Sequence, residues 1–197
     1  LRGGQGDLAS VMALEGGIDT IRLDAGDLYD VYAADGIDRI DVDGAMLGSL
    51  YAAGGINRVV ADRLDGGSLI AEGDLRKVCL GAITNGAYVQ GLNVGELAAG
   101  TIDGGSLLLA LGDVQKISAG EVRWADVVIS GDVDRLYADT ISGSELGTTT
   151  ISVIGRVGQL RAGTITGGLN GTLSLAFEGG IDKLVVGLLE GGQAVDG

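Results

Sequence analysis

The sequence contains no histidine and no proline, and its single cysteine is Cys79. Without histidine the chain cannot build a Ser-His-Asp or Cys-His catalytic arrangement, and it lacks the commonest metal-ligating side chain. A lone cysteine excludes a disulfide framework within the chain. The absence of proline suits a chain whose backbone amides nearly all donate hydrogen bonds to neighbouring strands, because proline has no amide proton to donate.

Basic and aromatic residues are scarce. Lys and Arg number 13 against 27 Asp and Glu, which gives a net charge of −14, and only 4% of the residues are aromatic. This charge balance disfavours nucleic-acid binding, because such binding depends on neutralising phosphates. The sequence has no apolar run long enough for a membrane-spanning helix, so membrane insertion is not expected.

Glycine and aliphatic residues are abundant, and they recur with a period. Of the 197 residues 38 are Gly, and 46% are hydrophobic. An aliphatic anchor residue follows each Gly- or Asp-rich turn, and successive anchors stand about 19–20 residues apart, a spacing that lengthens to about 24 after Val133. The anchors are Ile18, Ile37, Ile56, Leu75, Val94, Val114, Val133, Val157 and Ile181. Such a period is typical of a solenoid.

Apolar residues also stand at fixed distances from each anchor. The third residue after it is always aliphatic, from Ile21 to Leu184, and the fifth is always apolar, from Leu23 to Val186. This spacing of two is the periodicity of a β-strand. We therefore predict an all-β fold, a single-stranded parallel β-helix (β-solenoid) with short strands, about 19–20 residues per coil and nine to ten coils.

The chain is predicted to form one β-solenoid domain over residues 1–197, with regular coils over 6–143 and longer 24-residue coils with loops over 144–180. The extra residues fall at the same phase of the coil, so we expect two neighbouring protrusions on one edge. Neither 1–6 nor 193–197 has the polar character of a solenoid cap, so the ends are expected to be open to stacking.

The strings GGIDTIRL, DGIDRIDV and GGINRVVADRLDGGSLIAEGD resemble the Gly/Asp-rich repeats of very large secreted or cell-surface proteins of bacteria, including planctomycetes. The resemblance covers almost the whole chain, although the 24-residue units depart from the regular repeat. It implies an extracellular or surface-attached protein and no catalytic residue.

A basic column stands two residues after the anchors, with acidic residues beside it. Its members are Arg39, Arg58, Lys77, Lys116 and Arg135, interrupted by Thr20, Glu96 and Gln159. The favoured interpretation is that opposite charges neutralise one another between stacked coils. A groove for an anion or an acidic glycan is the alternative.

An acidic column lies further along the coil, and we expect no cofactor there. Its members are Asp24, Asp43 and Asp62, followed by Asp27, Asp65 and Asp103. Stacked carboxylates without a basic counterpart could share Ca²⁺. The calcium-binding nonapeptide GGxGxDxUx is absent, however, so a solvated acidic edge is favoured.

Two further functions are alternatives to a structural role. A carbohydrate-active β-helix of the lyase or hydrolase type would use clustered acids and bases, and Asp41, Asp43, Asp62 and Arg63 are the candidates. These residues recur as elements of the repeat instead of forming one unrepeated cluster, so we predict that the chain is not an enzyme. An ice- or surface-binding solenoid would need flat rows of Thr, and 148–150 is a single local run.

The residue five positions before each anchor should face solvent, because its neighbours on both sides are expected to face the core. It is nevertheless apolar in seven consecutive coils, beginning at Ala13. The six larger members are the predicted interaction residues: Tyr32, Tyr51, Ile70, Val89, Leu109 and Val128. Such residues also suit strands for packing reasons alone, so a purely structural role stays open.

These observations predict a non-enzymatic, extracellular structural or adhesive solenoid, either the subunit of a filament or a segment of a large surface protein. It would self-associate through the outer apolar strip and through its uncapped ends. The alternative partners are another segment of the same polypeptide, a glycan or a surface ligand.

Overall fold

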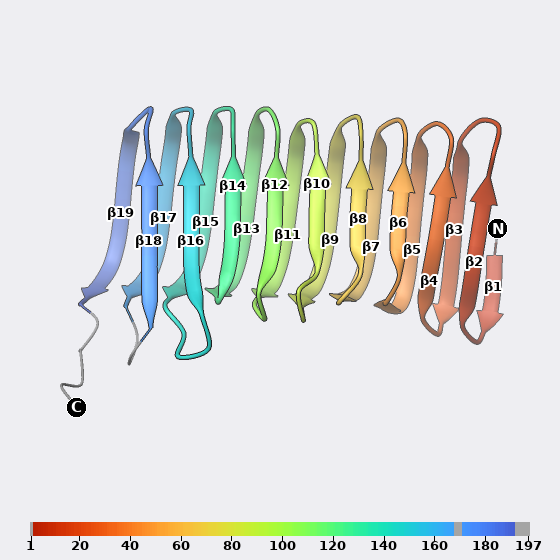
Figure 1. Ribbon diagram of the computed structural model, residues 1–197, viewed down its shortest axis with the longest axis horizontal. Coiled ribbons are helices and arrows are strands. Elements are labelled where there is room, and N and C mark those ends of the chain that lie inside the picture. Colours follow the sequence, from red (N-terminus) through yellow and green to blue (C-terminus); the bar gives the residue numbers. More distant parts are fainter. Residues whose placement is uncertain (1, 168–170, 192–197) are drawn as a thin grey trace.

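In the computed structural model the chain, described for residues 2–167 and 171–191, forms two parallel sheets that enclose one core (Figure 1). The described residues form nineteen strands, and each strand pairs in parallel with the strand two places further along the chain. Odd-numbered and even-numbered strands therefore form two sheets, which are joined where β4 pairs with β5 at Leu28 and Met46. The chain changes sheet at every turn.

The odd-numbered strands form what we call the long-strand sheet: β1 (Arg2–Gln5), β3 (Ile18–Ala25), β5 (Ile37–Met46), β7 (Ile56–Asp65), β9 (Leu75–Thr84), β11 (Val94–Ile102), β13 (Val114–Arg123), β15 (Val133–Ser142), β17 (Val157–Thr166) and β19 (Ile181–Glu190). The even-numbered strands form the short-strand sheet: β2 (Leu8–Ala13), β4 (Leu28–Ala33), β6 (Ser49–Ala52), β8 (Ser68–Ala71), β10 (Tyr88–Gly91), β12 (Ser106–Ala110), β14 (Ala125–Ile129), β16 (Thr148–Val153) and β18 (Thr172–Phe177).

Most strands of the long-strand sheet are longer than the short strands that the pattern predicted. In β7, which has 10 residues, two consecutive residues face outward at two places, Asn57 with Arg58 and Asp62 with Arg63. The alternation of inward and outward side chains breaks at these places, although the hydrogen-bonded ladder continues. The strand bends at these places but does not end. The alternation of apolar and polar residues in the sequence cannot distinguish such a bend from a turn.

The pairing register confirms a parallel β-solenoid with about 19 residues per turn. Seven successive steps in the long-strand sheet, from the pair Arg2–Arg22 to the pair Val114–Val133, each advance the chain by about 19–20 residues. The next two steps, from Val133 to Val157 and from Val157 to Ile181, are longer. The predicted count of nine to ten coils is therefore not matched. About seven turns have the regular length, because the turns before β16 and β18 contain additional residues.

The core consists of stacked columns of aliphatic side chains. The third residue after the anchor is at most 2% exposed in every coil from Ile21 to Leu160. In β19, the last described strand, the same position is Leu184, which is 57% exposed. Ladder pairing places like residues directly above one another, so each coil buries the apolar surface of the next.

Close stacking also explains a column of glycines on the long strands. A Cβ atom on Gly100 would lie 2.4 Å from the carbonyl oxygen of Gly81, and one on Gly120 would lie 2.6 Å from that of Gly100. No real side chain tolerates such a contact, so these bends require glycine in order for the backbones to approach.

The first of the two predicted protrusions is seen beside the start of β16, where Ser144 and Gly147 form an isolated antiparallel bridge (Figure 1). A Cβ atom on Gly143 would lie 2.2 Å from the carbonyl oxygen of Gly167, so the two long turns begin side by side. Residues 168–170 of the second protrusion, and the uncapped end predicted at 193–197, lie outside the described residues. The described residues include no helix that could span a bilayer.

Candidate functional site

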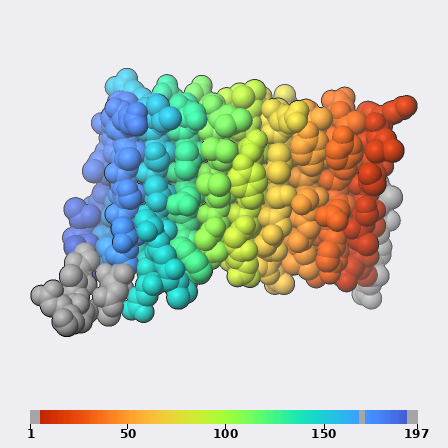
Figure 2. Space-filling view, viewed as in Figure 1, coloured from red at the N-terminus to blue at the C-terminus, as the bar shows by residue number. Residues whose placement is uncertain are grey.

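The outer surface of the short-strand sheet carries a row of stacked side chains, which we call the central row (the face is seen in Figure 2). One residue per coil contributes to it: Met12, Tyr32, Tyr51, Ile70, Gln90, Leu109, Val128, Ser152 and Ala176. Five of the six predicted interaction residues lie in this row. Tyr32 is 39% exposed, and Tyr51, Ile70, Leu109 and Val128 are half-buried.

The prediction that Val89 faces outward is wrong. Val89 is 0% exposed and pairs with Leu69 and Leu108 in the core, while Gln90 takes the outward position. The turn after β10 is one residue shorter than the turns after β8 and β12. Counting back from the anchor therefore misses the register by one, and a one-residue slip moves a strand side chain to the other face.

The same error occurs in the first coil. Ala13 pairs with the buried Ala33, so it belongs to the inward side of the strand, and Met12 pairs with Tyr32 and is 65% exposed. Counting six residues back from Ile18 would place Met12 in the core instead. The turn between β2 and β3 is longer by one residue than the turn between β4 and β5, which shifts this coil in the direction opposite to that of β10.

Two tyrosines of the central row stack on each other. The ring centroids of Tyr32 and Tyr51 lie 5.4 Å apart, and the rings are inclined by only 10°. The hydroxyl of Tyr51 donates a hydrogen bond to Glu72 on the next coil, and this bond raises the pKa of the Tyr51 phenol. Because the rings cover each other's faces, they present mainly their edges to a partner.

A second apolar row, which we call the flanking row, was missed by sequence reasoning. Two residues after the central row lie Leu14, Leu92, Leu111 and Ile154, which are 69%, 45%, 50% and 51% exposed. Leu111 and Ile154 donate backbone hydrogen bonds to the preceding coil, so they stay in register with the sheet. The signal was present, since the outward alternation simply continues past the strand. Together the central and flanking rows form what we call the apolar face.

The opposite side of the solenoid, the outer surface of the long-strand sheet, carries charges. Lys77 Nζ lies 2.9 Å and Lys116 Nζ 3.0 Å from the carboxylate of Glu96, which sits between them on the intervening coil. The hydrogen bonds from Lys77 and Lys116 hold the pKa of Glu96 below its ordinary value. For these residues the interpretation of charge neutralisation between stacked coils is confirmed.

The two kinds of surface are separated in the described part of the chain that precedes β19. All ten ion pairs found there involve the long strands or the turns that bound them. Of the twelve large hydrophobic residues that are exposed there, none lies on a long strand before β19. One face of the solenoid is therefore apolar and the other is covered by paired charges.

The residues proposed for carbohydrate chemistry are partly brought together. Asp41, Asp43 and Asp62 line one shallow groove on the long-strand sheet, together with arginines of the neighbouring coils. Asp41 is paired with Arg39 and lies 3.8 Å from Arg58. The fourth candidate, Arg63, is not part of this groove and pairs with Asp65.

The carboxylates proposed for Ca²⁺ have partners within the protein. Asp27 accepts a hydrogen bond from the backbone amide of Ala45, 2.8 Å away. Three others form ion pairs with arginine: Asp24 with Arg22, Asp65 with Arg63 and Asp103 with Arg123. The assumption that this column lacks a basic counterpart is therefore wrong at these three positions. Within the described residues no group of three or more acidic or Cys side chains is placed to hold a metal ion.

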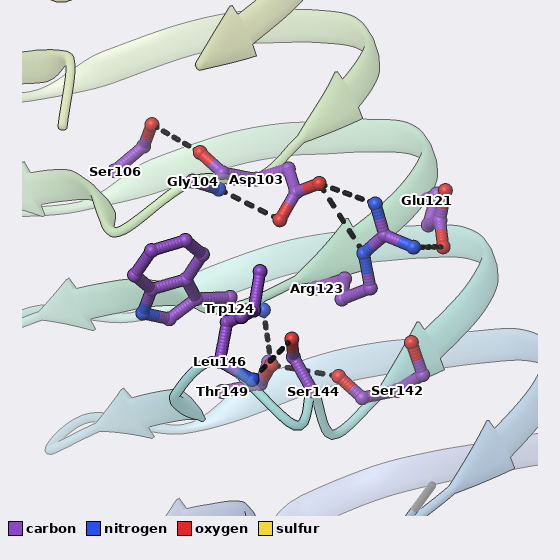
Figure 3. Close-up of polar contacts among 10 residues, drawn as sticks. All are labelled: Asp103, Gly104, Ser106, Glu121, Arg123, Trp124, Ser142, Ser144, Leu146 and Thr149. Carbon is purple, nitrogen blue, oxygen red and sulfur yellow. Dashed lines mark hydrogen bonds and ion pairs between the residues drawn. The ribbon is translucent and has the colours of Figure 1, made fainter. Parts of the chain in front are cut away.

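The edge near the first protrusion holds the polar cluster drawn in Figure 3. Trp124 has a positive φ of 44°, and its amide donates to Thr149 Oγ1 at 2.6 Å. Thr149, which is fully buried, donates in turn to the carbonyl oxygen of Ser142 at 2.7 Å. These bonds connect the longer coil, which contains Thr149, to the regular coil that contains Trp124. The central Thr of the 148–150 run is thus a structural residue and does not form part of an exposed Thr row.

Compared with protein-family models, with curated proteins and with solved structures, the chain matches none.

Proposed function

We propose that this chain is a non-enzymatic structural or adhesive element that assembles with copies of itself. The observation that carries the proposal is the separation of exposed apolar residues and ion pairs onto opposite faces of the solenoid. Apolar side chains gathered on one face do not stabilise a monomer in water. They do stabilise a contact in which that face is buried. That contact is supplied by the central row from Tyr32 to Val128 and by Leu92 and Leu111 of the flanking row.

End-to-end stacking is the second part of the proposal. In β19 the side chains that face the core in other coils are open to solvent, with Leu184 57% and Leu189 74% exposed. At the other end Leu8, Val11 and Ile18 are only partly buried. A further coil would cover these residues, whether it comes from another copy or from more of a longer polypeptide.

The setting of the protein is proposed from its repeats. Their resemblance to the Gly/Asp-rich repeats of large secreted and surface proteins of bacteria supports an extracellular or cell-surface location. A rigid stack of hydrogen-bonded coils suits a filament subunit or a segment of a large surface protein, because its role would be mechanical. The net charge of −14 supports partners other than nucleic acid.

The test replaces two residues in the middle of the central row. Tyr51→Lys with Ile70→Lys places two charges on the contact surface, and we expect self-association to weaken by about tenfold or more. Val60→Lys with Cys79→Lys is the matched control, because these half-buried residues occupy adjacent outward positions on the opposite face. Sedimentation and electron microscopy are the measurements. A wild-type chain that stays monomeric at high concentration would refute the proposal.

A second candidate, a carbohydrate-active solenoid, is favoured by one observation, the shallow groove that gathers Asp41, Asp43 and Asp62. In this case the purified protein would shorten an acidic polysaccharide, and Asp62→Asn would abolish the shortening. The ion pairs that Asp41 makes with two arginines favour the structural function instead, because they occupy that carboxylate.

A further inference from the structure

The central row changes in size along the solenoid. Its side chains are large from Met12 to Ile70, intermediate at Gln90 and Leu109, and small at Ser152 and Ala176. The central row is therefore a wedge, thick at its N-terminal end and thin at its C-terminal end. The shape of the wedge restricts how a second apolar face can lie against it.

A parallel pair of copies would place each central-row residue opposite itself. Tyr32 would meet Tyr32 at one end and Ser152 would meet Ser152 at the other, so the two faces would touch at one end and gape at the other. An antiparallel pair places the thick end of one wedge on the thin end of the other. Uniform separation is what allows continuous packing at the density of a protein interior.

The row also has a natural centre. It contains one residue from each of β2 to β18, and the middle strand of this series is β10. A two-fold axis through β10 pairs large with small residues away from the centre: Met12 with Ala176, Tyr32 with Ser152 and Tyr51 with Val128. Nearer the centre Ile70 faces Leu109, which has the same size, and Gln90 faces itself.

Gln90, the polar residue of the central row between Ile70 and Leu109, falls on this axis. Its Oε1 atom accepts a hydrogen bond from the hydroxyl of Tyr88, which orients the amide. An amide oxygen accepts two hydrogen bonds and the amide nitrogen donates two, so two Gln90 side chains related by the axis can bond each other reciprocally. A buried polar pair of this kind selects one register over its neighbours.

The flanking row is compatible with the same axis. At β10 Leu92 meets its own copy, and near the ends the exposed Ile154 meets the small Ala34. Glu72 faces Leu111 in this arrangement, and its carboxylate is held by the hydroxyl of Tyr51. Because the rotation axis runs along the strands, the two short-strand sheets pack with aligned strands, as sheets do in sandwiches.

The size of the face fits a pair of copies. From β2 to β16 it is roughly 34 Å long at about 4.8 Å per coil, and the two rows with their side chains are roughly 15–20 Å wide. This gives on the order of 600 Å² per copy, somewhat below the ~800 Å² of a standard stable interface. The charged faces point away from each other, so the pair is closed and adds no third copy laterally.

We propose that a second copy of this chain covers the apolar face, antiparallel to the first, about a two-fold axis that passes through Gln90. This arrangement rests on the lateral self-assembly proposed above, which it makes specific. It assigns the lateral contact to pairs, so growth into filaments occurs only through the ends of the stack.

Cysteine crosslinking tests the arrangement. In a Cys79→Ser background, Tyr32→Cys and Ser152→Cys are prepared separately and treated with a short thiol crosslinker, alone and mixed. The antiparallel pair predicts at least about tenfold more crosslinked dimer in the mixture than in either variant alone. The reason is that the same residue of the two copies lies roughly 29 Å apart along the length of the solenoid. Met12→Cys with Ala176→Cys repeats the test at the ends, in case replacing Tyr32 weakens the contact.

The outcomes separate the two proposals. Self-crosslinking of Tyr32→Cys alone would overturn the antiparallel arrangement and leave lateral self-assembly standing. A wild-type chain that sediments as a monomer would refute lateral self-assembly itself. Gln90→Cys, which lies on the axis, should crosslink to itself, and its failure to do so in a sedimenting dimer would also overturn the arrangement.

Discussion

The hydroxyl of Tyr51 donates a hydrogen bond to the carboxylate of Glu72 on the next coil. This bond raises the pKa of Tyr51, so its contribution to stability is complete below the ordinary phenol pKa of about 10 and is lost as the pH rises through the higher folded-state value. In an alkaline titration followed by tyrosinate absorbance, Glu72→Gln should shift one tyrosine to lower pH. Tyr51→Phe should remove that same transition, and a shift that survives Tyr51→Phe would contradict the assignment.

The ion pairs of Glu96 give the stability of the fold the opposite dependence on pH. Its lowered pKa, caused first by Lys77 and then by Lys116, means that its ion pairs stabilise the fold above the ordinary carboxyl pKa of about 4.3. That stabilisation is lost as the pH falls through the lower folded-state value. Glu96→Gln should reduce the free energy of unfolding at neutral pH by about 0.5–1 kcal/mol, a figure kept small because solvent screens the partly exposed pair.

Urea unfolding at neutral pH and near pH ~3 measures this difference, which should be smaller in acid. Asp62→Asn, which removes an exposed carboxylate on β7, is the control and should change little. An equal loss of stability for Glu96→Gln at both pH values would show that the ion pairs are not its cause.

The buried hydroxyl of Thr149 should be needed for the first long coil. Thr149→Val leaves the amide of Trp124 and the carbonyl of Ser142 without their partner, which should cost about 1–3 kcal/mol. Trp124 is the only tryptophan, so its fluorescence reports on this edge directly. Thr149→Ser keeps the hydroxyl and should behave nearly as wild type; equal damage by both variants would point to packing rather than to the hydrogen bonds.

Gly100 should not accept a side chain. In Gly100→Ala the new Cβ would lie 2.4 Å from the carbonyl oxygen of Gly81, so the two coils must separate. We expect destabilisation of about 1–3 kcal/mol, the usual range for overpacking, measured by chemical denaturation. Ser118→Ala, at a half-buried outward position on the next long strand, is the control and should lie within about 0.5 kcal/mol of wild type. A wild-type stability for Gly100→Ala would contradict the close stacking of the coils.

The flanking row should contribute to assembly as well as the central row. Leu111→Lys places a charge on the apolar face and should weaken self-association by about tenfold. Leu146→Lys is matched to it, because Leu146 is 75% exposed but lies on the protrusion, away from the face. Sedimentation velocity over a range of concentrations distinguishes them. If both variants assembled alike, the flanking row would have no role in the contact.

Much of the candidate site followed from counting residues in the sequence. Tyr32, Tyr51, Ile70, Leu109 and Val128 were found because the coils keep one length between these strands, so distance from the anchor predicts orientation. Val89 was misplaced because the turn between β10 and the anchor Val94 is one residue shorter than its neighbours. Leu92 and Leu111 were missed because they lie just past the strand, where alternation was not expected to continue.

The sequence by itself determined the all-β parallel solenoid, its regular period and the aliphatic columns of its core. A spacing of two defines a strand, and a constant repeat forces like residues to stack. Only the tertiary structure decided the two sheets, the partners of each charge and the separation of apolar and charged faces. These depend on where the chain turns between sheets and on which coil lies above which. Lys77 and Glu96 are a full coil apart along the chain, and only the stacking of β9 on β11 makes them neighbours.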